Sequence, residues 1–577
     1  MSRPVSLNDN PLLKMALAGN RSQMLMLIMA LSFLGLAGRA AYLQVFTNEY
    51  LQKEGASRYS RTLEMPASRG KILDRHGVIL ASSLPAKAIW AVPDQIEATP
   101  AQAAQLAKLL DIPLIDLKKK LADEDRNFVY LKRQVEPEVS AKIAAMELAG
   151  IYQKKEYKRH YPEGESAAHV VGFTNVEDRG QEGFELSQER SLAGKVGSRR
   201  VIKDRLGRVI ESEDGMDEPH DGKDLTLSID SKVQYLAFAA VRDAVKEHKA
   251  KAGAAVVLDT VTGEVLALAN WPTYNPNARS QLTGAQLRNR VITDTFEPGS
   301  TMKPFIAGMA VESGKFSPKT QIQTAPGKLT IGTATIHDAH PHGLLTVEQI
   351  IQKSSNVGTV HMAMKFDRQQ MWDLYTHLGF GQAPQMGFPG AVAGRLRPHK
   401  NWRPIEQATM SYGHGVSVSL IQMARAYSVF ARDGDLIPVS MLKTDAQAAG
   451  VQVFKPETAR AVRKMLEMAA GPEGTAPKAQ IRDYRVAGKT GTAHKQEDGK
   501  YVNKYVSSFV GLAPASNPRL VVAVMIDEPS AGKYYAGDVA APLFSKLTGD
   551  ALRALRVAPD SPGANLVIPT EPVKESL

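Results

Sequence analysis

The sequence of 577 residues contains no cysteine and few aromatic residues. The absence of cysteine excludes disulfide bonds, thiolate metal sites and a cysteine nucleophile. Aromatic residues make up 6% of the chain, and they are not interleaved with basic residues as in proteins that bind single-stranded nucleic acid. The composition is that of a folded protein and not of a disordered one, because 43% of the residues are apolar and 23% are charged.

Acidic residues are outnumbered by basic ones, and the formal net charge is +11 at pH 7. A basic chain can bind polyanions such as nucleic acid, anionic lipid or a carboxylate-rich polymer. A large solvated basic surface accounts for the charge equally well. Because aromatic residues are scarce, we do not expect nucleic acid to be the partner. The chain is too long for one ordinary hydrophobic core, so we expect two or more domains.

The N-terminal region contains a long uncharged run. The run extends from Ser22 to Gly38, and basic residues precede it. Apolar residues resume after Arg39 as AAYLQVF. Residues 22–46 are together long enough to cross a hydrocarbon layer of roughly 30 Å. The basic flank predicts a cytoplasmic tail at 1–21 and places the rest of the chain outside the membrane. A cleaved signal peptide is the alternative, but the resumed apolar stretch favours an uncleaved anchor.

Small residues recur within the expected span at roughly helical spacing, at Ala30, Ala37 and Ala41. Such residues can form a packing face for another helix, and Arg39 could pair with another membrane protein. The plain alternative is that alanine is common in membrane spans and that Arg39 extends to the outer headgroups.

Residues 47–222 form an expected non-catalytic domain outside the membrane, with many short turn signals. SRGKILDRHGVILA at 68–81 predicts two strands around a turn, TPAQAAQLAKLL at 99–110 predicts a helix, and KDRLGRVIE at 203–211 resembles a hairpin. The polar segment EDGMDEPHDGKD at 213–224 marks a domain boundary. No residues here have catalytic spacing, so we interpret the charged ones as structural ion pairs and turn residues.

Residues 223–556 form the second expected domain, and a proline-rich tail follows at 557–577. A helix is predicted at 232–248, followed by two strands of a hairpin at 253–270. The other predicted elements are one helix and three strands, at 419–434, 484–493, 505–514 and 519–529. Strands at both ends with helices between them indicate an α+β fold, in which helices cover one mainly antiparallel sheet.

Three short motifs occur in order within this second domain. They are Ser300-Thr-Met-Lys303 in FEPGSTMKP, Ser354-Ser-Asn356 in QKSSNVG, and Lys489-Thr-Gly-Thr492 in a late strand. Each motif alone is weak evidence, since it can equally be a helix cap, a turn or a strand end. The ordered trio is typical of penicillin-binding proteins and class A β-lactamases.

With these motifs the chain resembles the class B penicillin-binding proteins and, within that class, the septal peptidoglycan transpeptidases. The resemblance covers about residues 20–555 and includes RGKILDRHG, HVVGFTN, GRVIE, RNRVITDTFEPGSTMKP and AGKYYAGDVAAPLF. It implies a serine penicillin-binding fold with a five-stranded sheet between helices, carried on an elongated, dimerisation-type pedestal. It also implies one transmembrane helix in the cell inner membrane. Ser355 stands where the middle motif usually has aspartate, a position that varies in the family.

The resemblance implies a catalytic role for each motif. Ser300 is the nucleophile and Lys303 its base, which requires a neutral amine and therefore a depressed pKa. Burial at a helix N-terminus and the charge of Lys489 would both depress that pKa. Ser354 relays a proton between Lys303 and the leaving amine. The oxyanion would accept hydrogen bonds from the backbone N–H groups of Ser300 and Thr492.

The same resemblance implies a binding site for the donor peptide, with no metal or cofactor. Asn356 holds a substrate amide, and Lys489, Thr490 and Thr492 bind the terminal carboxylate of a D-Ala-D-Ala stem. Gly491 lacks a side chain, so that a peptide can lie along the strand edge. The serine attacks the penultimate D-Ala carbonyl, and an amine of a neighbouring stem then resolves the acyl-enzyme. β-Lactams mimic the donor and inhibit the enzyme.

Three other functions stay open. A class A β-lactamase hydrolyses its acyl-enzyme with a glutamate followed four residues later by asparagine, and no such pair follows Ser354. A transpeptidase of wall elongation would share all three motifs. A penicillin-sensing receptor usually adds an output module, whereas only about 21 residues precede the expected span. The partners implied by the resemblance are an FtsW-type glycosyltransferase, through the span, and other divisome proteins, through the pedestal.

Overall fold

The structure is a computed structural model, and it describes residues 19–46, 60–122, 126, 128–203, 209–444, 446–497, 499–564, 566–567 and 569. Most of the predicted tails at 1–21 and 557–577 therefore lies outside the described residues. Contacts divide the chain into two units, which we describe separately. One comprises Met1–Ala67 and Lys195–His220, and the other comprises Ser68–Gly194 and Asp221–Leu577.

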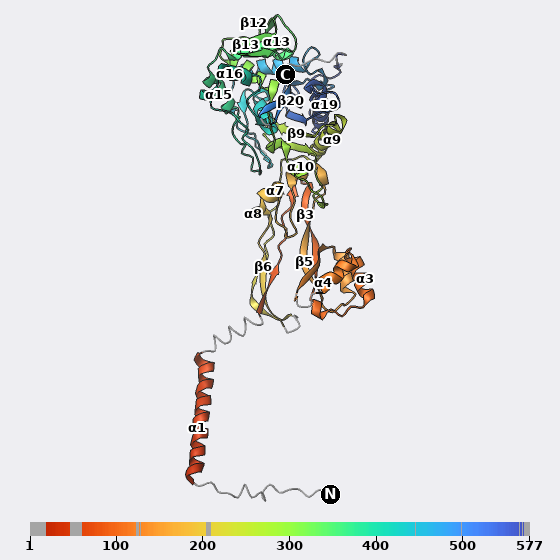
Figure 1. Ribbon diagram of the computed structural model, residues 1–577, viewed down its shortest axis with the longest axis vertical. Helices are drawn as coiled ribbons and strands as arrows, with labels where there is room; N and C mark the ends of the chain where they lie inside the picture. The colour runs from red at the N-terminus through yellow and green to blue at the C-terminus, as the bar shows by residue number, and fades with distance from the viewer. Residues whose placement is uncertain are drawn as a thin grey trace. The chain divides into compact units, whose positions relative to one another are not determined.

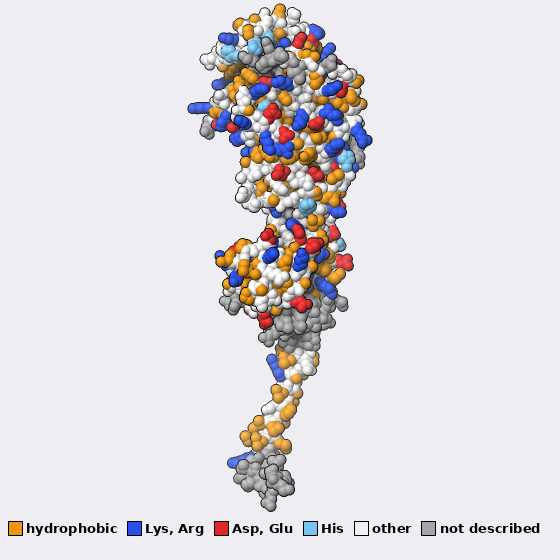
Figure 2. Space-filling model, turned by 90° about the vertical axis from the view of Figure 1, so that its right-hand side faces the viewer, with side chains coloured by type: hydrophobic (Ala, Val, Ile, Leu, Met, Phe, Trp, Pro, Cys, Tyr) orange, Lys and Arg blue, Asp and Glu red, His pale blue; other side chains and the backbone are white. Residues whose placement is uncertain are grey.

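The first unit contains a long apolar helix and a small sheet. Helix α1 (Gly19–Ala41) continues into a π-helical turn, η3 (Tyr42–Phe46), and together they include the candidate membrane span Gly19–Val45. The span has 27 residues, and an 18-residue stretch within it has a mean hydropathy of 1.8. Figure 2 shows hydrophobic side chains along this helix. The guanidinium of Arg39 lies 5.6 Å from the ring centre of Tyr42. The helix is thus long and apolar enough to be the predicted membrane anchor.

The sheet of the first unit has three antiparallel strands in the order β1-β6-β7. They are β1 (Ser60–Met65), β6 (Gly197–Lys203) and β7 (Val209–Asp217). The hairpin predicted at 203–211 is the β6–β7 pair, whose turn lies outside the described residues. This sheet therefore joins two stretches of chain that are far apart in the sequence.

The second unit begins with the non-catalytic sheet in the order β4-β3-β2-β8, with β5 also paired to β3. The strands are β2 (Ile72–Leu73), β3 (Ile79–Ala91), β4 (Val129–Val135), β5 (Ile151–His160) and β8 (Leu225–Thr226). The helices that pack on it are α3 (Pro100–Leu109), α4 (Leu114–Leu121) and α5 (Pro137–Ala144). The predicted helix at 99–110 is α3, and Thr99 with Gln102 forms its capping box.

A buried ion network lies where this sheet meets α7 (Gly183–Ser187). Glu185 accepts from Arg69 Nε at 2.5 Å and from Arg159 Nε at 2.7 Å, and all three side chains are at most 2% exposed. Arg159 also donates to the backbone oxygen of Gly70 at 2.7 Å. Charges in an apolar interior are tolerated when they are paired and hydrogen-bonded in this way. Arg69, Arg159 and Glu185 are therefore structural ion-pair residues, as the sequence indicated for charged residues of this region.

The core of the second unit is a five-stranded antiparallel sheet in the order β10-β9-β21-β20-β19 (Figure 1). The strands are β9 (Ala252–Asp259), β10 (Val265–Trp271), β19 (Ala487–Glu497), β20 (Lys500–Ala513) and β21 (Leu520–Asp527). Every residue of β9 is buried, because helices cover both faces of the sheet. The predicted α+β fold with five strands is confirmed.

Helices pack on the two faces of this sheet. One face contacts α9 (Ser231–Glu247) and α19 (Ala536–Ala554), with Phe509 of β20 packed on Phe544 of α19 at 4.6 Å between ring centres. The other face contacts α17 (Leu420–Ala431) and α18 (Pro456–Ala470). The three motifs of the sequence lie on this second side, at the ends of helices and on β19.

Candidate active site

Ser300 lies in a 3-10 turn, η6 (Gly299–Met302), that leads directly into α12 (Lys303–Glu312). Ser300 and Lys303 are three residues apart, a spacing that would place both in the first turn of one α-helix, but the α-helix begins at Lys303. Pro304 has no N–H to donate back to the Ser300 carbonyl, so α-helical bonding cannot start earlier. The N–H of Lys303 donates to that carbonyl instead. Tyr427 Oη donates to the Thr301 carbonyl at 2.8 Å and holds the turn in place.

Lys303 is fully buried, and its ammonium nitrogen bonds to Ser354. The Nζ atom lies 3.1 Å from Ser354 Oγ and 2.5 Å from the Ser354 carbonyl oxygen. Ser354 follows α13 (Val347–Lys353) and has the left-handed backbone conformation, with φ of 60°. A buried amine without polar partners would be costly, so this pairing is a condition for keeping Lys303 in the core.

Ser355, the residue that replaces the usual aspartate, caps α14 (Asn356–Ala363). Its Oγ accepts the Gly358 N–H at 2.9 Å and donates to Asp338 Oδ2 at 2.7 Å. The other oxygen of Asp338 accepts the Val357 N–H at 3.0 Å. Asp338, which lies 17 residues earlier in the sequence and belongs to no motif, therefore holds the start of α14 in place.

Asn356 is buried, and only one of the two polar atoms of its side-chain amide has a hydrogen-bond partner among the described residues. Its Nδ2 donates to the His337 carbonyl at 3.0 Å, whereas its Oδ1 has no hydrogen-bond partner among the described residues. An unpaired buried acceptor is unfavourable by about 1–3 kcal/mol. The amide thus retains an acceptor for an N–H group of a bound peptide.

Lys489 and Thr490 of β19 are both buried, and they form a network with Thr475. Lys489 Nζ lies 3.0 Å from Thr490 Oγ1 and 3.3 Å from Thr475 Oγ1, and the two hydroxyls are 2.9 Å apart. Thr475 lies between α18 and β19, and no motif of the sequence pointed to it. An ammonium with two hydroxyls is a suitable set of donors for a carboxylate.

Gly491 lets β19 approach η6, the turn that contains Ser300 and is called the nucleophile turn after the role predicted for this serine. A Cβ atom at this position would lie 2.5 Å from the Pro298 carbonyl oxygen and 2.9 Å from Thr301 Cγ2. The sequence analysis linked the missing side chain of Gly491 to the access of a peptide along the strand. In the structure, a side chain here would instead collide with the turn that contains Ser300. Thr492 Oγ1 accepts the Ala536 N–H at 2.9 Å, which ties β19 to α19. Among the described strands β19 pairs only with β20, so its other edge is unpaired.

Glu297 and His414 also lie beside the nucleophile turn, although neither belongs to a motif. Glu297 accepts the Gly415 N–H at 2.8 Å and the Tyr501 hydroxyl at 3.0 Å. Burial raises the pKa of Glu297, and these two hydrogen bonds offset part of the effect. Burial lowers the pKa of His414 to about 4, with a contribution from the charge of Lys303. His414 is therefore neutral at physiological pH.

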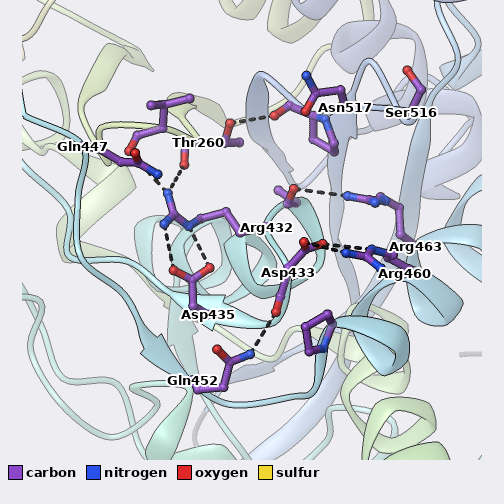
Figure 3. A pocket seen from close by; sticks show the side chains of 14 residues that line it. Thr260, Arg432, Asp433, Asp435, Gln447, Gln452, Arg460, Arg463, Ser516 and Asn517 are labelled. Carbon is purple, nitrogen blue, oxygen red and sulfur yellow. Dashed lines mark hydrogen bonds and ion pairs between the residues drawn. The ribbon is translucent and has the colours of Figure 1, made fainter.

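A separate cavity of about 640 Å³ contains none of the motif residues (Figure 3). Two of its arginines form ion pairs, Arg432 with Asp435 at 2.8 Å and Arg460 with Asp433 at 2.7 Å. The third, Arg463, donates to the Ala431 carbonyl at 3.2 Å. On the face shown in Figure 2, basic and acidic side chains are interspersed over the second unit. No group of three metal-ligating side chains occurs among the residues that the structure describes.

Comparison with known families matches both parts of the chain. Residues 253–549 match the penicillin binding protein transpeptidase domain, and residues 64–227 match the penicillin-binding protein dimerisation domain. The probable peptidoglycan D,D-transpeptidase PenA of Neisseria meningitidis is 43% identical over 550 residues, 94% of each chain. The peptidoglycan D,D-transpeptidase FtsI of Escherichia coli K12 is 41% identical over 542 residues, 93% of this chain and 91% of that one.

Solved structures give the same result. The transpeptidase domain of penicillin-binding protein 3 from Burkholderia pseudomallei is 51% identical, with a TM-score of 0.54, and covers 58% of this chain and 98% of its own. A peptidoglycan synthetase from Bifidobacterium adolescentis is 26% identical, with a TM-score of 0.68, and covers 88% of this chain and 99% of its own.

Proposed function

Because the chain belongs to the class B penicillin-binding proteins and is a peptidoglycan D,D-transpeptidase, we propose that it cross-links stem peptides at the division septum through an acyl-enzyme on Ser300. The observation that carries the serine assignment is the buried contact between Lys303 and Ser354, directly after the turn that holds Ser300. A serine hydroxyl needs such a neighbouring base before it can attack a carbonyl.

The first half-reaction forms the acyl-enzyme. Ser300 Oγ attacks the penultimate D-Ala carbonyl while Lys303 takes its proton. The oxyanion receives hydrogen bonds from the backbone N–H groups of Ser300 and Thr492, and removal of one such donor typically costs about 10²–10³ in rate. Ser354 Oγ, at 3.1 Å from Lys303 Nζ, passes the proton to the nitrogen of the departing D-Ala.

The donor peptide binds in an extended form along the unpaired edge of β19. Main-chain hydrogen bonds to a sheet edge give affinity, and flanking side chains give specificity. Lys489, Thr490 and Thr492 bind the terminal carboxylate. The unpaired Oδ1 of Asn356 accepts an N–H of the peptide. Gly491 supports this arrangement by packing the strand against the nucleophile turn.

The test is the intact mass of the purified protein after exposure to benzylpenicillin, followed over hours. We expect a persistent gain of one drug mass that Ser300→Ala abolishes. Ser313→Ala, at the other end of α12, is the matched control and should be labelled like the wild type. A mass gain that disappears within seconds as the drug is hydrolysed would indicate a β-lactamase. Labelling that survives Ser300→Ala would refute the assignment of the nucleophile.

The septal role and the membrane topology belong to the same proposal. One N-terminal apolar helix is in keeping with a single-pass protein of the inner membrane. We infer a cytoplasmic N-terminus and a periplasmic catalytic domain from the basic residues before the helix. Depletion in cells separates the two wall-building roles. Filaments would support division, and rounded cells would instead assign the protein to elongation.

A further inference from the structure

A half-buried carboxylate, that of Glu297, lies three residues before the proposed nucleophile, and no lysine, arginine or histidine among the described residues pairs with it. Glu297 accepts hydrogen bonds from the Gly415 N–H and the Tyr501 hydroxyl, at 2.8 Å and 3.0 Å. It forms no ion pair within 4.0 Å with any residue that the structure describes. A carboxylate that is partly removed from water is stabilised by hydrogen bonds, as here, and further by a cation that binds to it.

The backbone holds this carboxylate and an aromatic wall directly beside Ser300. The Gly299 N–H donates to the Gly413 carbonyl at 3.3 Å, and a Cβ atom on Gly413 would lie 2.2 Å from the Gly299 carbonyl oxygen. The segment Tyr412-Gly-His-Gly415 therefore runs along the residues that precede the serine. Movement of the nucleophile relative to this segment would need the close backbone contact to break.

Three rings line the wall next to Glu297. The ring centres of Tyr412 and His414 are 5.2 Å apart, and those of His414 and Tyr501 are 6.1 Å apart. His414 is neutral, so its ring adds no repulsion to a cation. Aromatic faces beside a carboxylate are the surroundings in which proteins bind ammonium groups.

The second half-reaction requires such a ligand, since the amine of the acceptor stem is an ammonium in neutral water. We propose that Glu297, with the rings of Tyr412, His414 and Tyr501, binds the ammonium of the acceptor strand and holds it next to the acylated serine. This inference rests on the proposed acyl-enzyme at Ser300. It places the binding site for the acceptor amine of the second step at residues outside the three motifs.

The chemistry balances with groups already present. The ammonium gives one proton to the Glu297 carboxylate and becomes a neutral amine. The amine attacks the acyl carbonyl, a C–N bond forms, and the C–O bond to Ser300 breaks. The second proton of the nitrogen returns to Ser300 Oγ through Lys303, and Glu297 then releases its proton to water.

The experiment measures aminolysis by the full-length protein in detergent, with a D-alanyl thioester as donor. D-alanine serves as an acceptor that is an ammonium at neutral pH, and hydroxylamine as one that is uncharged. For Glu297→Gln we expect the D-alanine concentration at half-maximal aminolysis to rise about tenfold. The corresponding hydroxylamine concentration should change by less than twofold. Glu297→Asp, which keeps the charge, should restore part of the loss.

Two controls keep the test specific. Glu312→Gln, at the opposite end of α12, makes the same chemical change away from the site and should behave like the wild type. Acylation by benzylpenicillin shows whether the nucleophile turn of Glu297→Gln is intact. Equal losses with both acceptors, or a tenfold loss of acylation, would overturn the inference, because Glu297 would then only support the fold of the turn.

The wild type alone tests the underlying function. If it is acylated but transfers the acyl group to neither acceptor, the proposed transpeptidation fails and the inference fails with it. If the wild type uses both acceptors and Glu297→Gln discriminates between them as expected, the ammonium site is established independently of the septal role.

Discussion

The hydroxyl of Thr475 completes the group of donors around Lys489 and Thr490. We expect Thr475→Val to lower the rate of acylation by benzylpenicillin about tenfold, which corresponds to about 1.4 kcal/mol, because a hydrogen bond to a charged group is lost. The measurement is the second-order acylation rate of the purified protein. Thr548→Val is the matched control, since the Thr548 hydroxyl is buried with no partner among the described residues. Similar rates for both variants and the wild type would contradict a role of Thr475 in the site.

Single residues of the site were predictable only where a motif contains them. Ser300, Lys303 and Ser354 follow from the ordered motifs, and the structure brings the last two into contact. Thr475 and Asp338 could not be found in this way, because each is placed by tertiary contacts and has no characteristic neighbours in the sequence. Ser355 gave no signal for Asp338 either, because the middle position of this motif varies in the family.

At the scale of elements, one ion cluster joins β19 to β21 across the intervening strand. Lys495 of β19 lies 2.7 Å from both Asp527 and Glu528, and Lys251 lies 2.9 Å from Glu528. Burial alone would raise the pKa of Glu528, but hydrogen bonds from the two lysines lower it to about 2. The cluster therefore stabilises the sheet that carries the binding strand.

This cluster predicts a dependence of stability on acid pH. A depressed pKa means that the contribution of Glu528 is complete above its ordinary pKa of 4.5 and is lost as the pH falls toward 2. Because the group is partly solvated, we expect about 1 kcal/mol at pH 6. The wild type should melt a few degrees above Glu528→Gln at pH 6, and the difference should shrink as the pH falls from 4.5 and vanish only below the folded pKa of about 2. A constant difference over this range would exclude the linkage.

Helices and strands with a long and regular hydrophobic pattern could be predicted from the sequence, and short elements without one could not. Long apolar runs predicted β20, β21 and the hairpin of β9 and β10, because strands that are buried on both faces are continuously apolar. The 3-10 turn before α12 was not predicted, since its position depends on the missing N–H of Pro304. The hairpin predicted at 68–81 is the β2–β3 pair. The two-residue strand β8 has no pattern of its own, and it forms only through pairing with β2.

For the whole molecule, the membrane helix presents a face of small residues, at Ala30, Ala37 and Ala41, to a possible partner helix. We expect Ala37→Leu to reduce co-purification of an FtsW-type polymerase several-fold, because a larger side chain separates helices that pack closely. Ser32→Leu, on the opposite side of the helix, is the matched control. Penicillin labelling of Ser300 should stay at the wild-type level in both variants. Unchanged co-purification of Ala37→Leu would refute a packing role of this face.

The left-handed backbone of Ser354 has a consequence for engineering and evolution. A side chain in this conformation costs about 1–2 kcal/mol, which glycine would avoid. Selection for thermostability alone would thus replace the serine, whereas the proton relay that we propose between Lys303 and the leaving amine requires its hydroxyl. At position 354 thermal stability and catalytic rate therefore oppose each other. We expect a variant that is more resistant to heat to be a slower enzyme.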